Sequence, residues 1–424
     1  MEEFLKVLKH EAAELKSHFS ENPRLAEMFE KCYLSTAETT VKRLDDGSLF
    51  VITGDIPAMW LRDSSAQVQH YMPAAQKSAV VRELIEDVVK KQFFYINLDP
   101  YSNAFNEAQN GRHYALDNSG QTDWTWERKY EMDSLSFPVS LAYKLWREAG
   151  TTAHLDETAH SAMRLIVETF KCEQNHEEKS PYRFERETDK ATETLSRGGL
   201  GAKTAYTGMT WSGFRPSDDA CTYGYSIPEN MFAAVALSYI STISKEIWQD
   251  DTLAEAADAL RKEILDGIEK YGTVETERFG KIYAFEVDGL GNKLIIEDAN
   301  IPGILSAPYF GFCDINDDIY QNTRRMALSD ANTYYFKGKA LTGIGSVHSK
   351  PNRVWPISLI TQAMTAKTQA ERDEIIKMLI STDDGTGYMH EAIDKDDPSI
   401  YTRPWFAWAN SYFCELLMTN IGLI

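Results

Sequence analysis

The chain has 424 residues, and its 44 lysine and arginine side chains face 64 aspartate and glutamate side chains, which gives a formal net charge of −20 at pH 7. Nucleic acids and anionic membranes bind basic surfaces, so this charge argues against both as partners. The length allows two or three domains, although a closed helical toroid also reaches this size as one unit.

The five cysteines are scattered along the chain and include no CxxC pair. This pattern argues against a structural zinc site or a disulfide framework and favours reduced thiols in a cytosol. The first residues have the pattern of an amphipathic helix without a signal-peptide core, and no run of eighteen apolar residues is present to span a membrane. The sequence therefore predicts a cytoplasmic protein and leaves its oligomeric state open.

The hydrophobic pattern predicts a mostly helical chain. Helices are expected at 1–19, from Asn22, after the loop 55–64, and at 80–95, 134–149, 155–171, 227–246, 252–270, 317–329, 354–366, 369–381 and 405–419. Two β-hairpins are expected, one around Asp45-Asp46-Gly47 and one at 280–296 that turns at 289–292. The stretch 173–226 lacks a sustained helical period, which is typical of a functional or mobile segment.

Several apolar helices follow a polar loop that carries a carboxylate or an arginine, with a proline near the junction. These loops are 55–64, 131–140, 217–230, 346–358 and 401–410. The helices between them lack such loops, and this alternation indicates a ring of helical hairpins whose inner helices all start at one mouth. A solenoid would need a fixed repeat length, which is missing. We therefore predict one all-α toroid over residues 1–424, with small β-hairpins.

The loop 211–230 carries the first candidate acid. Asp218 and Asp219 stand among aromatic residues, just before a helix whose start has the capping-box pair Ser226 and Glu229. Adjacent carboxylates in such surroundings suit an acid whose pKa is raised by burial and by a like-charged neighbour. Taken alone, the loop is also explained as a surface turn; the recurrence of similar loops favours a catalytic role.

A mouth lined by acidic, arginine, histidine and tryptophan side chains suits the cleavage of a glycosidic bond. That reaction needs one protonated carboxyl group and a second, ionised one from another segment. Glu391 follows an aromatic residue and a histidine in a glycine-rich loop and is the second candidate, although most loop glutamates only cap or solvate their loop. Arg62 and Asp63 either hold sugar hydroxyl groups or form a structural ion pair.

The remaining polar residues of these loops have structural explanations as well. His348 is more often a satisfied loop histidine than a ligand, and Arg403 either closes the mouth or stabilises the last helix. The sequence contains no HExxH, His-x-His, EF-hand, phosphate-loop or GxSxG motif, and no GxGxxG after a strand. It therefore implies no metal, no nucleotide cofactor and no serine-hydrolase triad.

Three segments together, TGDIPAMWLRDS, RPSDDACTYGYSIPENMF and GYMHEAIDKDDPSIYTRPWFAWANSYF, resemble family 125 of the glycoside hydrolases, the exo-acting α-1,6-mannosidases. The resemblance runs from the first of these loops to the last helix. It implies an (α/α)6 barrel that needs no metal and no other cofactor. It also implies release of terminal mannose from mannose-containing oligosaccharides such as N-glycan fragments, with inversion at the anomeric carbon.

By this resemblance, Asp218 would be the general acid and Glu391 the base that activates water. The candidate substrate-binding residues are Trp60, Arg62, Asp63, Asp123, Asp133, Ser217, Asp219, His348 and Arg403. An inverting enzyme needs its two carboxyl groups roughly 6.5–9.5 Å apart, whereas a separation near 5 Å indicates a retaining mechanism. We expect Asp219 or another neighbouring acid to keep Asp218 protonated near neutral pH.

Two other kinds of function stay open. One is a different enzyme on the same barrel, either another glycosidase or a sugar epimerase, which generally needs a pair of facing histidines. The other is a non-catalytic glycan-binding protein with a decayed site.

Overall fold

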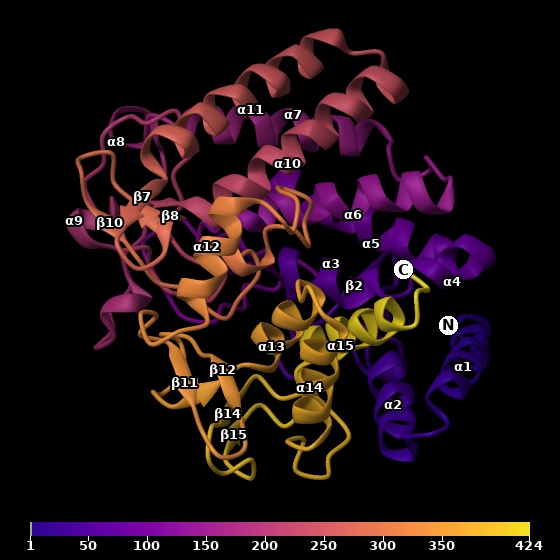
Figure 1. Cartoon of the computed structure of the whole chain (residues 1–424). Coiled ribbons are helices and arrows are strands. Elements are labelled where there is room, and N and C mark those ends of the chain that lie inside the picture. Colours follow the sequence, from indigo (N-terminus) through magenta and orange to yellow (C-terminus); the bar gives the residue numbers. More distant parts are fainter. Residues whose placement is uncertain (1) are drawn as a thin grey trace.

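The computed structural model describes residues 2–424 and shows a ring of paired helices (Figure 1). Within these residues the inner wall consists of α3 (Leu61–Gln69), α6 (Asp133–Ala149), α10 (Ile227–Ile243), the 3-10 turn η4 (Ile304–Ser306), α13 (Pro356–Met364) and α15 (Ala407–Asn420). Contacts run from α3 through α6 to α10, and from η4 through α13 and α15 back to α3. Phe232 of α10 packs on Phe310, four residues after η4, with ring centroids 5.0 Å apart, and this contact closes the ring.

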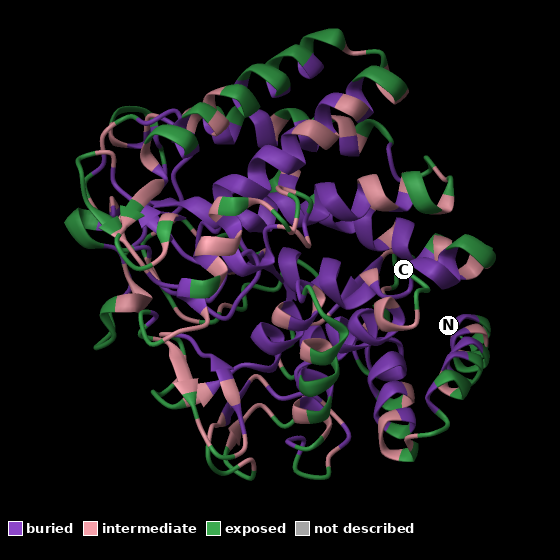
Figure 2. Ribbon diagram, viewed as in Figure 1, coloured by how far each residue is buried: buried purple, intermediate pink, exposed green. Residues whose placement is uncertain are grey.

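A second set of helices covers the inner wall. They are α2 (Pro23–Thr39) on α15, α5 (Ala79–Leu98) on α6, α7 (Glu157–Glu173) on α5, α11 (Asp251–Tyr271) on α10, α12 (Asp318–Ala327) on η4 and α14 (Gln369–Ile380) on α13. Outer and inner elements alternate along the chain, so the fold is the predicted (α/α)6 barrel. Figure 2 shows the physical basis: α10 is buried almost throughout, whereas α11 exposes one face.

Shorter helical pieces connect or extend these pairs. They are α1 (Glu2–Lys16), which packs on α2, η1 (Ser17–Phe19), α4 (Met72–Lys77), α8 (His176–Lys179), η2 (Ala191–Glu193), α9 (Ser196–Gly199) and the π-helical turn η3 (Ser244–Trp248). No helix within residues 2–424 is both long and apolar enough to cross a membrane.

Small antiparallel sheets stand at the starts of the inner helices. The three-stranded ones are β3 (Met59–Trp60), β4 (Ala104–Phe105) and β5 (Thr125–Glu127); β6 (Tyr225–Ser226), β9 (Glu286–Val287) and β10 (Lys293–Leu294); and β13 (Arg353–Val354), β14 (Ala392–Asp394) and β15 (Tyr401–Thr402). The hairpins are β1 (Val41–Arg43) with β2 (Leu49–Val51), β7 (Thr273–Thr276) with β8 (Gly280–Tyr283), and β11 (Tyr335–Lys337) with β12 (Thr342–Ile344). Because β3, β6 and β13 directly precede α3, α10 and α13, the sheets frame one mouth of the barrel.

The helix starts follow from local side-chain chemistry. The Asn22 side chain accepts a hydrogen bond from the backbone N–H of Leu25 at the start of α2. The Ser226 side chain likewise accepts from the backbone of Glu229, 3.5 Å away. The predicted capping box is only half formed, because the Glu229 carboxylate accepts from the Ser212 hydroxyl, 3.2 Å away. The hydroxyl group of Ser212, from another segment, has replaced the backbone N–H of Ser226 as the donor to the Glu229 side chain.

Three boundaries differ from the sequence prediction. The helix expected at 80–95 continues to Leu98, and the one expected at 227–246 ends at Ile243, where the π-helical turn begins. The predicted turn at 289–292 does join β9 to β10. However, β8 pairs with the preceding strand, β7, in an antiparallel hairpin that the sequence did not indicate. Strand partners depend on the fold around them, which short apolar runs do not specify.

Candidate active site

Two adjoining cavities occupy the mouth at which the inner helices begin. The inner cavity encloses about 390 Å³ including its opening, and most of the side chains that line it are buried. The outer cavity, of about 700 Å³, is also lined by the exposed side chains of Asp55 and Tyr114 and therefore reaches solvent. Asp218, Glu391 and a few neighbours line both cavities and so mark the boundary between them.

A tight turn presents Asp218. The backbone N–H of Asp218 donates to the carbonyl of Arg215, 2.9 Å away, and Phe214 and Ala220 form a bridge below the turn. The turn holds Asp218 at φ = 65°, in the left-handed region that few non-glycine residues adopt. The Lys129 ammonium donates to the Asp218 carbonyl at 2.6 Å and fixes this conformation. Such strain is typical of functional positions.

The pairing of β14 with β15 presents Glu391. Ala392 and Thr402 are opposite each other in this ladder, so Glu391 and Arg403 lie side by side just beyond it. The Arg403 guanidinium reaches the Glu391 carboxylate at 3.5 Å and is itself held by Asp55, 2.9 Å from its Nε. The longer contact leaves the Glu391 carboxylate held but not engaged in a tight ion pair.

Arg62 organises a cluster of four carboxyl groups. Its Nη1 lies 2.8 Å from Glu131 and 3.0 Å from Asp133, its Nη2 lies 3.5 Å from Asp218, and its Nε lies 3.6 Å from Asp63. The Arg62 side chain is only 3% exposed. One guanidinium cannot compensate four buried negative charges, so the cluster favours the protonated form of at least one carboxyl group. Arg62 is held by these carboxyl groups and also lines the inner cavity, and its Nε has no hydrogen-bond partner among the described residues.

Glu131 and Asp218 both contact the Arg62 guanidinium, and each carboxyl group influences the pKa of the other. Burial raises the pKa of Glu131 well above its usual range; Arg62 opposes this, and the Asp218 charge adds to it. Burial also acts to raise the pKa of Asp218, but a hydrogen bond from Glu131 and the charges of Lys129 and Arg62 outweigh it and lower that pKa. The two shifts run in opposite directions, so the protonated form is favoured at Glu131 over Asp218.

The expectation that Asp219 or another neighbouring acid keeps Asp218 protonated near neutral pH is not met, because the pKa of Asp218 is lowered. The Asp219 carboxylate lies 3.3 Å from Nδ1 of His348, is 3% exposed and lines neither cavity. Burial lowers the pKa of His348, but its hydrogen bond with Asp219 and the nearby charges of Asp218 and Glu391 raise it to about 9. His348 is therefore a cation at neutral pH, and between the two adjacent acids only Asp218 faces the cavities.

The other predicted residues divide into two groups. Trp60, Asp63 and Ser217 line the inner cavity, and burial raises the pKa of Asp63 to about 6. Neither the Asp63 carboxylate nor the Ser217 hydroxyl has a hydrogen-bond partner in the described part of the chain, so both are available to a sugar. Asp133 lies behind Arg62 and lines neither cavity, and Asp123 is exposed on a loop outside them.

Several site residues were not predicted. Glu131 stands within a polar loop that the sequence singled out, but only the fold places it against Asp218. Asn300, Trp355 and Phe406, which were not predicted, complete the wall of the inner cavity together with Trp408. The last three directly precede or begin an inner helix, which is a usable signal, whereas Asn300 lies in a loop with no distinguishing pattern. Among residues 2–424, no group of three or more His, Cys, Asp or Glu side chains is arranged to hold a metal ion.

Comparisons with known proteins agree with this geometry. The sequence profile of a family described as metal-independent alpha-mannosidase (GH125) matches residues 22–418. A Schizosaccharomyces pombe protein, named meiotically up-regulated gene 157 protein, is 37% identical over 421 residues, covering 94% of this chain and 82% of that protein.

Solved structures give the same result. A Streptococcus pneumoniae protein from a family of metal-independent α-mannosidases, in a non-productive complex with α-1,6-mannobiose, is 44% identical with a TM-score of 0.97 over 99% of both chains. A glucoamylase from Saccharomycopsis fibuligera is 11% identical with a TM-score of 0.57 over 87% of both chains, and this likeness concerns the barrel alone.

Proposed function

We propose a specific reaction for this chain, which belongs to the family of metal-independent α-mannosidases, GH125. Membership makes the chain a glycoside hydrolase that acts on α-mannosides. We infer that it is an exo-acting α-1,6-mannosidase that inverts the anomeric configuration and acts in the cytoplasm on mannose-containing glycans such as N-glycan fragments. The mannobiose bound by the Streptococcus pneumoniae relative supports the α-1,6 linkage.

The two cavities support release of a terminal sugar. The inner cavity is walled by the buried rings of Trp355, Phe406 and Trp408, which suit the apolar face of one sugar ring. The free Asp63 carboxylate and Ser217 hydroxyl would accept and donate hydrogen bonds to its hydroxyl groups. The outer cavity would hold the next sugar, and the rest of the glycan would continue into solvent.

The observation that carries the proposal is that Asp218 and Glu391, far apart in the sequence, line the same two cavities. Asp218 would donate its proton to the oxygen of the leaving sugar at the boundary between the cavities. Glu391 would take a proton from the water that attacks the anomeric carbon from the opposite face. This geometry requires carboxyl groups roughly 6.5–9.5 Å apart, which stays a prediction.

Glu131 would supply the proton that Asp218 donates. Its side chain is fully buried and lines neither cavity, so Glu131 cannot reach the sugar itself. The raised pKa of Glu131 and the lowered pKa of Asp218 support Glu131 as the store of this proton. As negative charge develops on the leaving oxygen beside Asp218, the proton would pass through Asp218, and Glu131 would become ionised against Arg62, 2.8 Å away.

The decisive experiment is hydrolysis of α-1,6-mannobiose followed by proton NMR, with Asp218→Asn and Glu391→Gln as test variants. We expect β-mannose as the first product of the unmodified protein, and loss of most turnover in both variants with sugar binding retained. Asp123→Asn, on an exposed loop, is the matched control and should leave turnover unchanged. First release of α-mannose would overturn inversion, and normal turnover in Asp218→Asn would overturn the acid assignment.

A further inference from the structure

A large hollow lies at the end of the barrel opposite the catalytic mouth. It encloses about 1150 Å³ including its opening. Its walls come from the places where inner helices end: Gln69 is the last residue of α3, Met364 is the last residue of α13, and Lys144 and Glu415 lie in the second halves of α6 and α15. Because the catalytic residues stand at the starts of the same helices, this far cavity is a separate site.

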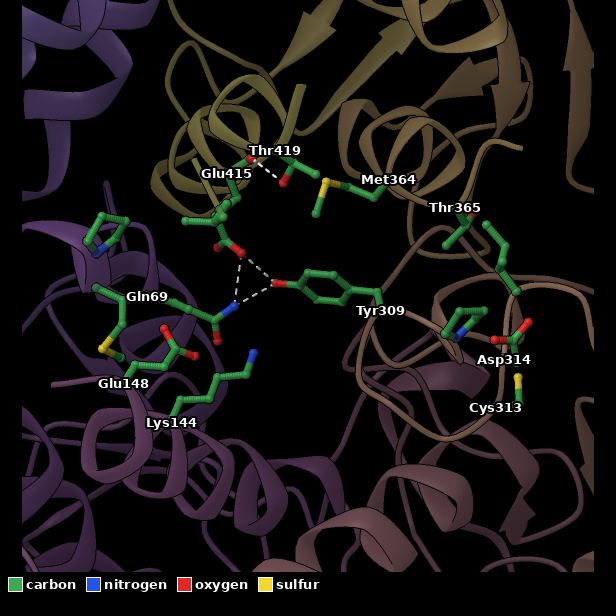
Figure 3. A pocket seen from close by; sticks show the side chains of 15 residues that line it. Gln69, Lys144, Glu148, Tyr309, Cys313, Asp314, Met364, Thr365, Glu415 and Thr419 are labelled. Carbon is green, nitrogen blue, oxygen red and sulfur yellow. Dashed lines mark hydrogen bonds between the residues drawn. The ribbon is translucent and has the colours of Figure 1, made fainter. Parts of the chain in front are cut away.

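Three polar side chains form a connected group on one wall of the far cavity (Figure 3). Oε2 of Glu415 accepts hydrogen bonds from the Tyr309 hydroxyl at 2.8 Å and from the Gln69 amide at 2.9 Å. The Gln69 amide also contacts the Tyr309 hydroxyl at 2.8 Å. The other Glu415 oxygen accepts no hydrogen bond from the described residues. The group is thus fixed in place and retains an acceptor for a ligand.

Lys144 points its ammonium group toward this polar group, as Figure 3 shows. The ammonium lies 5.6 Å from the centroid of the Tyr309 ring. Within residues 2–424 it makes no hydrogen bond and has no carboxylate oxygen within 4.0 Å. Burial lowers the pKa of Lys144, while the charges of Glu415 and Glu148 oppose that shift. Lys144 is half-buried and its ammonium has no protein acceptor, so a ligand hydroxyl group in the cavity can take the place of water as its hydrogen-bond partner.

We propose that the far cavity is a second carbohydrate-binding site that takes a neutral sugar. A sugar hydroxyl can accept from the Lys144 ammonium and donate to the free oxygen of Glu415 at the same time. The Tyr309 ring and the apolar side chains of Met72 and Met364 offer surfaces for the C–H face of the ring. This combination of a fixed acceptor, an unused donor and an aromatic wall matches a polyhydroxylated ring.

The charges of the far cavity select against an anionic ligand. Its single lysine faces three acidic side chains, Glu148, Asp314 and Glu415, so the potential disfavours an anion. A neutral polyol encounters no such repulsion, and Lys144 and Glu415 both gain hydrogen bonds from it. A cation is the competing class of ligand, and the amine in the test below distinguishes it from a sugar.

The methionines of the chain allow a local test by methyl NMR of the full-length protein labelled at methionine methyl groups. Met72 and Met364 line the far cavity, whereas Met389 lies two residues before Glu391 and reports the catalytic mouth. We expect mannose to shift the Met72 and Met364 signals saturably. In Lys144→Leu the affinity at these two signals should fall about tenfold or more, because a charged hydrogen-bond donor is lost.

Lys6→Leu, a change at an exposed position of α1, is the matched control and should leave both shifts intact. Glu415→Gln is a second test that keeps the side-chain size and should also weaken the response. Shifts of Met389 alone would place all sugar binding in the catalytic mouth and overturn the proposal. Equal responses to glycerol, or a response to an amine such as putrescine but not to mannose, would overturn the assignment to sugars.

Discussion

The substitution Glu131→Gln separates proton supply from every other role of this residue. Glutamine has nearly the same shape and keeps an oxygen to accept from Asn103, 3.0 Å away, or from Arg62, 2.8 Å away. Its amide N–H can still donate to Asp218, but it cannot transfer a proton. The variant keeps the size of the side chain and removes its acidic proton, and one of these two donors loses its acceptor oxygen.

The size of the effect follows from the role of general acid catalysis, which contributes about 10²–10⁴ in rate. Asp218 would have to take its proton from solvent, and its lowered pKa makes the protonated form rare at neutral pH. We expect turnover of α-1,6-mannobiose to fall by about 10²-fold. The free energy of unfolding should fall by about 1–3 kcal/mol, because one buried donor, on Asn103 or Arg62, loses its acceptor oxygen.

The assay compares two substrates that differ only in their need for a proton. The leaving sugar of mannobiose is a poor leaving group, whereas a dinitrophenyl mannoside releases a stable phenolate that needs no proton. Glu131→Gln should slow mannobiose about 10²-fold and the aryl mannoside less than about threefold. Asp218→Asn should show the same selectivity, and the double variant should be no slower than Asp218→Asn, because the two residues act as one unit.

Equal losses on both substrates would refute the reasoning, since they would assign Glu131 a purely structural role. Additive losses in the double variant would do the same. The melting temperature of each variant, measured alongside, distinguishes these outcomes from a loss of fold.

Three further outcomes follow from the same site. Arg62→Met leaves several buried carboxyl groups without their cation and should lower the free energy of unfolding by about 3–5 kcal/mol in a urea titration, whereas Asp123→Ala should leave it unchanged. Because the pKa of His348 is raised to about 9, its charged pair with Asp219 stabilises the fold fully below about pH 6.5. This stabilisation is lost as the pH rises through about 9. The melting temperatures of the unmodified protein and of His348→Gln should therefore converge above that pH. Glu391→Ala should be inactive and regain turnover with azide, yielding β-mannosyl azide; α-mannosyl azide would contradict inversion.

The sequence by itself determined the class of fold and the segments of the site. Helical periodicity, caps such as Asn22 and Ser226, and the alternation of polar and plain loops are local signals, and a ring of helical hairpins follows from them. The loops that carry Arg62 and Asp218 could be found because their polar residues precede apolar helices, and Glu391 because it follows an aromatic residue and a histidine in a glycine-rich loop.

Only the tertiary structure decided which charges meet. Asp219 is adjacent to Asp218 in the sequence and Glu131 is distant from it, yet Glu131 meets Asp218 at Arg62 while Asp219 is held by His348. Likewise, residues at the ends of the inner helices line the far cavity, including Lys144, and no sequence motif predicts this cavity. Helix periodicity is encoded within a few residues, whereas burial and the partner of a charge depend on segments brought together from the whole chain.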